Sequence, residues 1–254
     1  MKPSFRQSKI IDLIRENQRI DVNDLANHFG ASRETIRRDL SALSKQGKIQ
    51  KVHGGAVLAK MSAEGSFQRR MERNVQEKRQ IAKEAVKLFS ARDTIFIDTG
   101  STSIYFAEEI AKINNLTIIT NSALVAKVIT QANTTNKVFL LGGEYSGDNQ
   151  ETFGSLAIQQ IKTFRAHHVV LTIGALDGST GVMDFNINEA QIASAMLEQA
   201  QSLIVLADHT KFNNIASFQV CALDRITTLV CDKMPPKELY EELIQQNVEI
   251  IEAS

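Results

Sequence analysis

The chain has 254 residues, of which 43% are hydrophobic, so it can form one large domain or a small and a medium domain with buried cores, and most of it is not disordered. No apolar run follows the basic residues at its start, and no stretch approaches the roughly eighteen apolar residues that a membrane span needs. These features exclude a secreted or membrane protein by default. We therefore expect a cytoplasmic protein whose Cys221 and Cys231 are reduced thiols in the core.

The formal net charge of zero conceals an uneven distribution. Residues 1–60 carry twelve Lys and Arg against six Asp and Glu, a net charge of +6, so residues 61–254 carry −6. A basic segment on an acidic body is typical of a chain whose basic end binds an anionic partner, although a solvated charged surface gives the same pattern.

The basic segment is predicted to contain three short helices and a hairpin. A helix over residues 5–16 precedes a second one at VNDLANHF, where Asp21 and Asp24 resemble a capping box and Gly30 ends the helix. Ser32 is a suitable N-cap for a third helix. The glycine pair that follows KIQKVH indicates a hairpin between two short extended segments.

The third helix, which contains ASRETIRRDLSAL, separates apolar from basic side chains. Ile36, Leu40 and Leu43 share one face of an ideal helix, while the arginines point away from it. Such a helix after a tight turn is typical of a helix-turn-helix, whose second helix enters the major groove, and the hairpin adds a wing. Arginines and hydroxyls of the helix and basic side chains of the wing are the expected DNA contacts. These residues are Ser32, Arg33, Thr35, Arg37, Arg38, Ser41, Lys51 and His53.

The remainder of the chain alternates between apolar strands and amphipathic helices. Residues 61–75 lose this periodicity and are predicted to be a linker, so the winged helix-turn-helix covers residues 1–60 and the second domain residues 76–254. Near-continuous apolar strands separated by helices predict a parallel sheet covered on both faces, so the class is α/β with a small α+β N-terminal domain. Strands are predicted at residues 94–98, 116–120, 137–141, 167–174, 202–208 and 226–232.

Polar residues follow these strands at the edge where open α/β sheets bind ligands. Glycine, hydroxyls and free N–H groups at a helix N-terminus suit a phosphate, and a lysine adds a mobile charge. Ordinary capping also explains each junction alone, and Glu189 is equally a first-turn acid or a ligand for sugar hydroxyls. The five histidines lack metal-ligand spacing, so no metal or cofactor is expected. The expected effector-binding residues are Asp98, Thr99, Gly100, Ser101, Thr102, Asn121, Ser122, Gly143, Glu189 and Lys211.

These motifs resemble those of a known family. The chain is similar to the DeoR-type bacterial transcriptional repressors over essentially its whole length. The motifs that carry this resemblance are VNDLANHFGASRETIRRDLSALSKQGKIQKVHGGA, EKRQIA, TIFIDTGSTS, LTIITNS, LLGGE, NEAQIASAM and DHTKF. The resemblance implies a second domain with the fold of ribose-5-phosphate isomerase and CoA transferases, which senses a phosphorylated sugar or related metabolite. VMDFNINEA with DHTKF looks most like the glycerol-3-phosphate and sulfosugar repressor branches.

The sequence departs from the family pattern in places. Lys51 stands where the family usually has Arg, and Ala31 where it usually has Val. Ala193 and Ser194 replace the familiar Lys-Arg pair, which removes two cations near the presumed effector site. A less anionic or differently shaped effector is compatible with that loss.

Two functions of different classes are compatible with the residues. The first is a repressor of a carbohydrate catabolic operon, which binds double-stranded operator DNA as a homodimer or homotetramer and is released by a phosphorylated sugar. The second is a sugar-phosphate isomerase with a DNA-targeting domain, for which Asp177, Asp184 and Glu189 are available carboxylates. The DNA-binding module is complete and no catalytic constellation is evident. The sequence therefore favours the regulator, with no catalytic residues.

Overall fold

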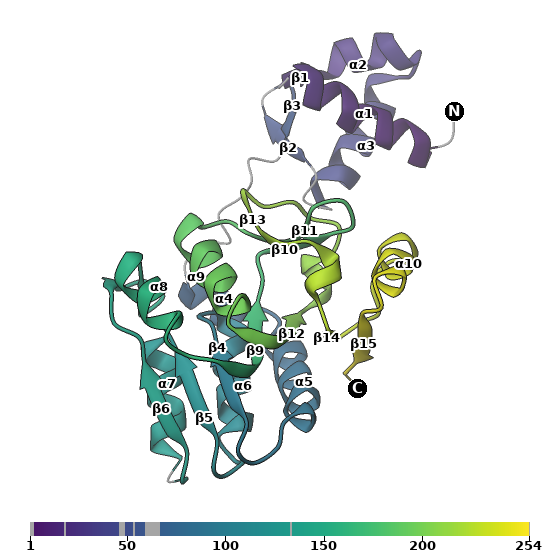
Figure 1. The fold of residues 1–254 in the computed structure, drawn as a ribbon. Helices are drawn as coiled ribbons and strands as arrows, with labels where there is room; N and C mark the ends of the chain where they lie inside the picture. Colours follow the sequence, from purple (N-terminus) through teal and green to yellow (C-terminus); the bar gives the residue numbers. More distant parts are fainter. Residues whose placement is uncertain are drawn as a thin grey trace. The chain divides into compact units, whose positions relative to one another are not determined.

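The computed structural model describes residues 3–17, 19–45, 49–52, 54–58, 67–132 and 134–253. The chain divides into two compact units, Met1–Ser62 and Ala63–Ser254 (Figure 1). Each unit has hydrophobic clusters of its own, so each buries its apolar side chains independently.

The first unit is a winged helix-turn-helix. Its strands form an antiparallel sheet in the order β1-β3-β2, in which Val52 and Gly55 face each other at the hairpin. The helices and the wing lie where the sequence predicts them, and the three-residue strand β1 is an addition too short to show a periodicity. The elements are α1 (Pro3–Asn17), β1 (Arg19–Asp21), α2 (Val22–Phe29), α3 (Arg33–Lys45), β2 (Ile49–Val52) and β3 (Gly55–Leu58).

The turn between α2 and α3 follows the predicted end signals, whereas the start of α2 does not. Gly30 ends α2 in the left-handed conformation with φ 58°, and the Oγ of Ser32 accepts a hydrogen bond from the backbone N–H of Thr35 at 3.1 Å. Asp21 precedes α2 but makes no side-chain cap hydrogen bond, so the predicted capping box is wrong. Asp21 is the last residue of β1, where it pairs with Gly55, so the sheet holds its backbone.

A small core and one buried ion pair hold the first unit together. Ile36 and Leu40 of α3 are 0% and 1% exposed and pack with apolar side chains of α1, α2 and the wing. The buried carboxylate of Asp39 accepts hydrogen bonds from Arg6 Nε at 2.6 Å and Gln7 Nε2 at 3.0 Å. This contact ties α1 to α3 and lies outside the predicted hydrophobic stripe.

The second unit contains a seven-stranded parallel sheet in the order β15-β14-β12-β9-β4-β5-β6. Five of its helices connect strands of this sheet and α5 precedes them. The elements of this layer are α5 (Val75–Ala85), β4 (Thr94–Ile97), α6 (Ser101–Ile110), β5 (Thr117–Thr120), α7 (Ala123–Gln131), β6 (Lys137–Leu140), α8 (Ser155–Ile161), β9 (Ala166–Thr172), α9 (Ile187–Leu197), β12 (Ala200–Ala207), β14 (Thr228–Cys231), α10 (Lys237–Gln245) and β15 (Glu249–Glu252). The alternating pattern predicts α5, α6, α7 and α9, whereas α8, α10 and the strand β15 are additions.

Smaller elements lie outside the main sheet. β7 and β8 form a hairpin, and β10, β11 and β13 form a separate antiparallel sheet. Three short 3-10 helices complete this set. The bounds are β7 (Glu144–Ser146), β8 (Glu151–Phe153), β10 (Ala175–Asp177), β11 (Gly181–Asp184), β13 (Phe218–Cys221), η1 (Val86–Leu88), η2 (His209–Lys211) and η3 (Leu223–Arg225).

The sheet is covered on both faces, which explains its continuous apolar strands. Ile95 and Ile97 of β4 pack with α5, α6 and α7, while Phe96 between them packs with the cluster that contains α8, α9 and α10. Since successive side chains of a strand point to opposite faces, a strand buried on both sides needs apolar residues at every position.

The structure corrects the predicted linker. A helix, α4 (Phe67–Glu72), lies within residues 61–75 and belongs to the second unit. Phe67 is 6% exposed and joins the hydrophobic cluster of α5 and α6. The helix has only six residues, too few for a periodic signal. Residues 61–66 of the predicted linker lie outside the described residues.

Candidate DNA-binding surface and effector site

The exposed face of α3 carries the predicted DNA-binding cations. Arg33, Arg37 and Arg38 are exposed, while the apolar residues of the same helix are buried. The orientation of these arginines is therefore the one predicted from the helical periodicity. Their contact with DNA stays a prediction.

The hydroxyls of α3 make hydrogen bonds within the first unit. Ser32 Oγ lies 2.9 Å from Thr35 Oγ1, and Ser41 Oγ donates to the carbonyl oxygen of Arg37 at 2.7 Å. Lys51 Nζ, on the wing strand β2, donates to Ser41 Oγ at 3.0 Å. This contact brings the wing and α3 onto one continuous surface. His53, the remaining predicted contact, lies outside the described residues.

The carboxyl edge of the second unit's sheet contains most of its buried polar residues. Strands β12, β9, β4 and β5 are neighbours, so the residues that follow them lie side by side. Polar side chains are rarely buried without partners, so this concentration makes the edge a candidate functional site. The buried polar residues of this edge are Asp98, Thr99, Ser101, Thr102, Ser103, Asn121, Ser122 and Asp208.

The N-terminus of α6 lacks a side-chain cap. Gly100 occupies the N-cap position of α6 and provides no side-chain hydrogen bond. In contrast, Ser122 caps α7 by accepting from Val125 N–H, and Asn186 caps α9 by accepting from Asn188 N–H. The first N–H groups of a helix have no acceptor within it, so the start of α6 can bind an anion.

Gly100 is required by packing against a neighbouring strand. A Cβ built at Gly100 would overlap the Oγ1 of Thr172 at the end of β9. A substitution at Gly100 would therefore disturb the junction of β4 and β9. Variants of the hydroxyl residues beside it are better probes of an anion site.

Asp98 is directed into the protein. Both of its carboxylate oxygens accept from the backbone N–H of Thr172 at 3.1 Å, and Ser103 Oγ donates to Oδ1 at 3.0 Å. Burial raises the pKa of Asp98 well above its ordinary value, the hydrogen bonds oppose that shift, and the negative charges of Asp184 and Glu189 add to it. Asp98 therefore positions the ends of β4 and β9 in the free protein.

Two buried side-chain oxygen atoms at this edge have no hydrogen-bond partner. Thr99 is 5% exposed and its Oγ1 is unpaired, and Asn121 is 0% exposed with an unpaired Oδ1. The two residues follow the neighbouring strands β4 and β5. A buried polar atom without a partner destabilises the free protein, so this pair is suited to receive hydrogen bonds from a ligand.

A network of amides and carboxylates surrounds this pair, and sequence analysis found only part of it. Asn149 Nδ2 donates to Glu189 Oε1 at 2.8 Å and to Glu151 Oε1 at 3.1 Å. Asn121 Nδ2 lies 3.4 Å from Glu151 Oε2. Burial raises the pKa of Glu151, while hydrogen bonds and the positive charge of Arg70 oppose the shift. Asn149 and Glu151 lie in and beside a hairpin strand of three residues, where no periodic signal marks them.

Asp208 lies close to two cations, Lys78 and Lys211. Asn74 Nδ2 donates to its Oδ1 at 3.1 Å, and the backbone N–H of Thr210 donates to the same atom at 3.0 Å. Burial would raise the pKa of Asp208, but hydrogen bonds from Thr210 and the positive charges of Lys211 and Lys78 hold the pKa below its ordinary value. The predicted Lys211 is thus close to the strand-end edge, and Lys78 was present in the EKRQIA motif without an assigned role.

Gly143, Ala193 and Ser194 make contacts within the fold of the second unit. Gly143 is exposed after β6, and its φ of 151° and contact with the carbonyl of Phe153 explain the glycine. Ala193 is buried in the core, and Ser194 Oγ donates to the carbonyl oxygen of Val220 at 3.0 Å. Ala193 and Ser194, which replace the family's Lys-Arg pair, therefore pack against their own unit.

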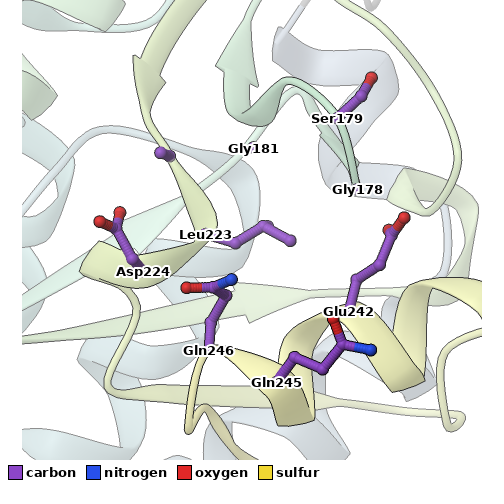
Figure 2. A pocket seen from close by; sticks show the side chains of 9 residues that line it. Gly178, Ser179, Gly181, Leu223, Asp224, Glu242, Gln245 and Gln246 are labelled. Atoms are coloured by element: carbon purple, nitrogen blue, oxygen red, sulfur yellow. The ribbon is translucent and has the colours of Figure 1, made fainter.

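A separate hollow of about 340 Å³ lies away from these residues (Figure 2). It is bounded by the turn between β10 and β11, by η3 and by α10. Its ionisable lining residues, Asp224 and Glu242, are both acidic, so it does not suit an anion. None of the predicted effector-binding residues lines it. The lining residues are Gly178, Ser179, Gly181, Ala222, Leu223, Asp224, Glu242, Gln245 and Gln246.

Comparison with known proteins decides the family. Residues 6–62 match the model of the DeoR-like helix-turn-helix domain, and residues 73–233 match that of the DeoR C terminal sensor domain. The chain belongs to the DeoR family. The resemblance inferred from the motifs is confirmed, and DeoR-type proteins are transcriptional regulators that bind DNA through the helix-turn-helix.

Curated members of the DeoR family match nearly the whole chain. The HTH-type transcriptional repressor CsqR of Escherichia coli is 32% identical over 97% of this chain and 94% of its own length. The regulator GolR of Listeria innocua is 35% identical over 95% of each chain. The glycerol-3-phosphate regulon repressor of Escherichia coli is 27% identical over 98% of this chain and 99% of its own. These relatives are regulators rather than enzymes.

Solved structures show a more distant likeness to this DeoR-family chain. Ribose 5 phosphate isomerase A from Neisseria gonorrhoeae covers 55% of this chain and 53% of its own, with 14% identity and a TM-score of 0.40. The eIF2B delta subunit from Chaetomium thermophilum covers 56% of this chain and 50% of its own, with 18% identity and a TM-score of 0.41. We draw no functional conclusion from likeness at this level.

Membrane-spanning helices and metal-binding clusters are both absent from the described part of the chain. Its helices include none long and apolar enough to cross a membrane. Its His, Cys, Asp and Glu side chains form no group of three or more that could hold a metal ion. Cys221 and Cys231 are buried and free, and burial raises the pKa of each thiol to about 12.

Proposed function

We propose that this DeoR-family regulator represses a carbohydrate catabolic operon and is released from operator DNA by a phosphorylated sugar or a related metabolite. The names of its relatives support the substrate class, since they include a glycerol-3-phosphate regulon repressor and a putative aga operon repressor. A helix-turn-helix protein that reads paired half-sites acts as a symmetric assembly, so the functional form in this proposal is a homodimer or homotetramer.

The proposed effector site rests on two buried oxygen atoms that lack hydrogen-bond partners, Thr99 Oγ1 and Asn121 Oδ1, which we name the unpaired couple. Both are buried at the ends of neighbouring strands, and the uncapped N-terminus of α6 begins two residues after Thr99. In this proposal the phosphate binds the first N–H groups of α6 and the hydroxyls of Ser101 and Thr102. The sugar hydroxyls bind the amides and carboxylates that surround the couple.

The mixed charge of the site suits a ligand that is both anionic and rich in hydroxyls. Lys78 and Lys211 lie near Asp208, and Arg70 lies near Glu151, so the cations of this edge stand beside carboxylates. Such a site binds one anionic group through backbone N–H groups, while carboxylates accept hydrogen bonds from hydroxyls. A multiply charged anion without hydroxyls fits it poorly.

A thermal-shift screen tests this proposal. The probes are glycerol 3-phosphate, ribose 5-phosphate, a sulfonated sugar and inorganic phosphate, with glycerol and ribose as uncharged controls. A probe that binds only the folded protein raises the Tm, and the same probe is expected to lower the affinity for operator DNA. A flat response to all phosphorylated and sulfonated probes would contradict the proposed effector class.

Thr99→Val makes the test specific for the unpaired couple. Valine has the shape of threonine without the buried hydroxyl, so the free protein is expected to be more stable by about 1–3 kcal/mol, while the probe-induced rise in Tm disappears. Thr228→Val is the matched control, because Thr228 is also buried but lies at the start of β14, at the opposite edge of the sheet. If a probe raised the Tm of Thr99→Val as much as that of the wild-type protein, the unpaired couple would not be part of the effector site.

A further inference from the structure

The segment of residues 67–78, which we name the α4–α5 elbow, connects two features of the molecule. It contains α4, the turn at Asn74 and the start of α5. It is the first described part of the second unit, and eight residues separate it in the sequence from the end of the wing strand β3. It is therefore the described part of the second unit that lies nearest in sequence to the DNA-binding unit.

The elbow contacts the strand-end edge through its side chains. Arg70 Nη2 donates to Asn149 Oδ1 at 2.8 Å, and Asn74 Nδ2 donates to Asp208 Oδ1 at 3.1 Å. Lys78 Nζ donates to the carbonyl oxygen of Arg70, which fixes the two halves of the elbow to each other. These contacts span long distances in the sequence, from Arg70 to the β7–β8 hairpin and from Asn74 to the end of β12.

The turn at Asn74 is shaped for this contact. Asn74 adopts the left-handed conformation with φ 51° and ψ 42°, and its side chain does not cap α5. The side chain instead binds Asp208, so a residue in a disfavoured conformation is held by a contact with the site.

The opposite side of the elbow is attached to α6. Phe67 is buried against the cluster of α6, and Tyr105 of α6 donates its hydroxyl to the carbonyl oxygen of Met71 at 2.9 Å. The guanidinium of Arg79 lies over the Tyr105 ring, 4.8 Å from its centroid. Helix α6, whose N-terminus is the proposed phosphate site, is therefore also the helix against which α4 packs.

We propose that the α4–α5 elbow couples effector binding to DNA binding, with Arg70 as the positioning residue that acts through Asn149. This inference rests on the proposed function, because it places the effector at the strand-end edge. Asn149 bonds at once to Arg70, Glu151 and Glu189. A ligand hydroxyl that takes the hydrogen bond of Glu189 or Glu151 changes the position of Asn149, and Arg70 follows.

Coupling of this kind is reciprocal and is measured as a ratio of affinities. If the probe weakens DNA binding by a given factor, DNA weakens probe binding by the same factor, and factors of about 5–150 are typical. The proposal predicts that variants of the elbow reduce this factor toward one. It also predicts that they retain the affinity for the probe, because the elbow positions the site without forming the phosphate cradle.

The test compares Arg70→Gln and Asn74→Gly with Arg69→Gln in the full chain. Arg69 is exposed on the same helix, so its variant is the matched control. Glycine accepts the left-handed conformation, so Asn74→Gly removes the contact with Asp208 and retains the turn. The affinity for a double-stranded DNA site, selected by the wild-type protein from a random library, is measured with and without glycerol 3-phosphate or ribose 5-phosphate.

The expected result is a loss of the probe effect on DNA affinity in Arg70→Gln and Asn74→Gly, with the probe-induced rise in Tm preserved. A probe effect equal to that of Arg69→Gln in both variants would overturn the proposal. If no probe raises the Tm of the wild-type protein, the proposed effector class is wrong. The coupling is then tested separately, by measuring the amide hydrogen exchange of residues 67–78 with and without DNA. A change in their exchange on DNA binding then supports the coupling, and unchanged exchange overturns it.

Discussion

The two functional regions of this protein use polar residues in opposite ways. On α3 the arginines are exposed and the apolar side chains anchor the helix, so the groups predicted to contact DNA contribute little to the stability of the fold. At the strand-end edge of the second unit the polar groups are buried, and several of them are hydrogen-bonded to one another. A surface for a large anionic partner needs exposed charge, whereas a site for a small ligand must exclude water and orient its groups. The comparison therefore predicts that substitutions separate function from stability in the first region and not in the second.

The largest expected effect comes from breaking the anchor of α3. Leu40 is 1% exposed, so Leu40→Ala is expected to destabilise the first unit by about 2–5 kcal/mol. A unit of about 60 residues is marginally stable, so specific DNA binding is lost. In calorimetry of the full chain, the wild-type protein should show a low-temperature transition of the first unit and a later one of the second unit. Leu40→Ala should lower or abolish the first transition and leave the second unchanged. Arg37→Ala, exposed on the same helix, should leave both transitions unchanged. A single transition that moves as a whole would show that the units do not unfold independently.

The second prediction concerns the boundary of the second unit. A fragment of residues 63–254 is expected to be more stable than one of residues 76–254, because the shorter fragment loses the buried Phe67 and the contact between Arg70 and Asn149. Burial of Phe67 alone corresponds to about 1.5–3 kcal/mol. Urea unfolding measures the difference, and Phe67→Ala in the longer fragment isolates the contribution of that side chain. Equal stability of the two fragments would show that residues 63–75 are a linker after all.

The third prediction sharpens the comparison at the DNA surface. Arg38→Ala is expected to cost about 1–3 kcal/mol on the selected DNA site, with little change in the Tm. Lys51→Ala is expected to weaken specific and non-specific binding alike and to reduce the salt slope by about one. Fluorescence anisotropy over a range of salt concentrations measures both effects. Parental affinity in both variants would remove α3 and the wing from the DNA interface.

The smallest expected effect is a pH dependence at the buried edge. Burial raises the folded-state pKa of Glu151 above its ordinary value of 4.5, so the folded state favours the protonated carboxyl. The stability that this group contributes is present below its ordinary pKa and is lost as the pH rises through the raised value. Glu151→Gln stays neutral and can still accept from Asn149, so its Tm should rise relative to the parent as the pH increases from acidic to neutral. The exposed Glu144→Gln, on the partner strand β7, is the control and should show no such trend.

The DNA-binding surface was predictable because its determinants are local. The 3.6-residue period places Ile36 and Leu40 on one side of α3 and Arg37 and Arg38 on the others, and Gly30 and Ser32 mark the turn through their own backbone and side-chain chemistry. The same reasoning predicted the main strands of the parallel sheet, because burial on both faces requires continuous apolar residues. The same reasoning failed at the start of α2, because the pairing of Asp21 in β1 with Gly55 in β3 holds the backbone of Asp21.

The candidate effector site was predictable only for the residues that directly follow strands. Asp98, Thr99 and Asn121 directly follow apolar strands, so their chain positions place them at one edge of any parallel sheet. Nothing in the sequence distinguishes the roles of these residues. The structure directs Asp98 toward Thr172 and leaves the oxygen atoms of Thr99 and Asn121 unpaired, because those outcomes depend on the distance between β4, β5 and β9.

The amino-acid sequence by itself determined the two-unit organisation, the exposed arginines of α3 and the alternation of strands and helices, because periodicity and capping act within a few residues of the chain. Only the tertiary structure decided that Arg70 and Asn74, which the sequence placed in a linker, contact the strand-end edge, and that Lys78 holds Arg70 in place. Their partners lie far away in sequence, on the β7–β8 hairpin and at the end of β12. A hydrogen bond between distant residues depends on how strands are ordered in the sheet, and no local pattern records that order.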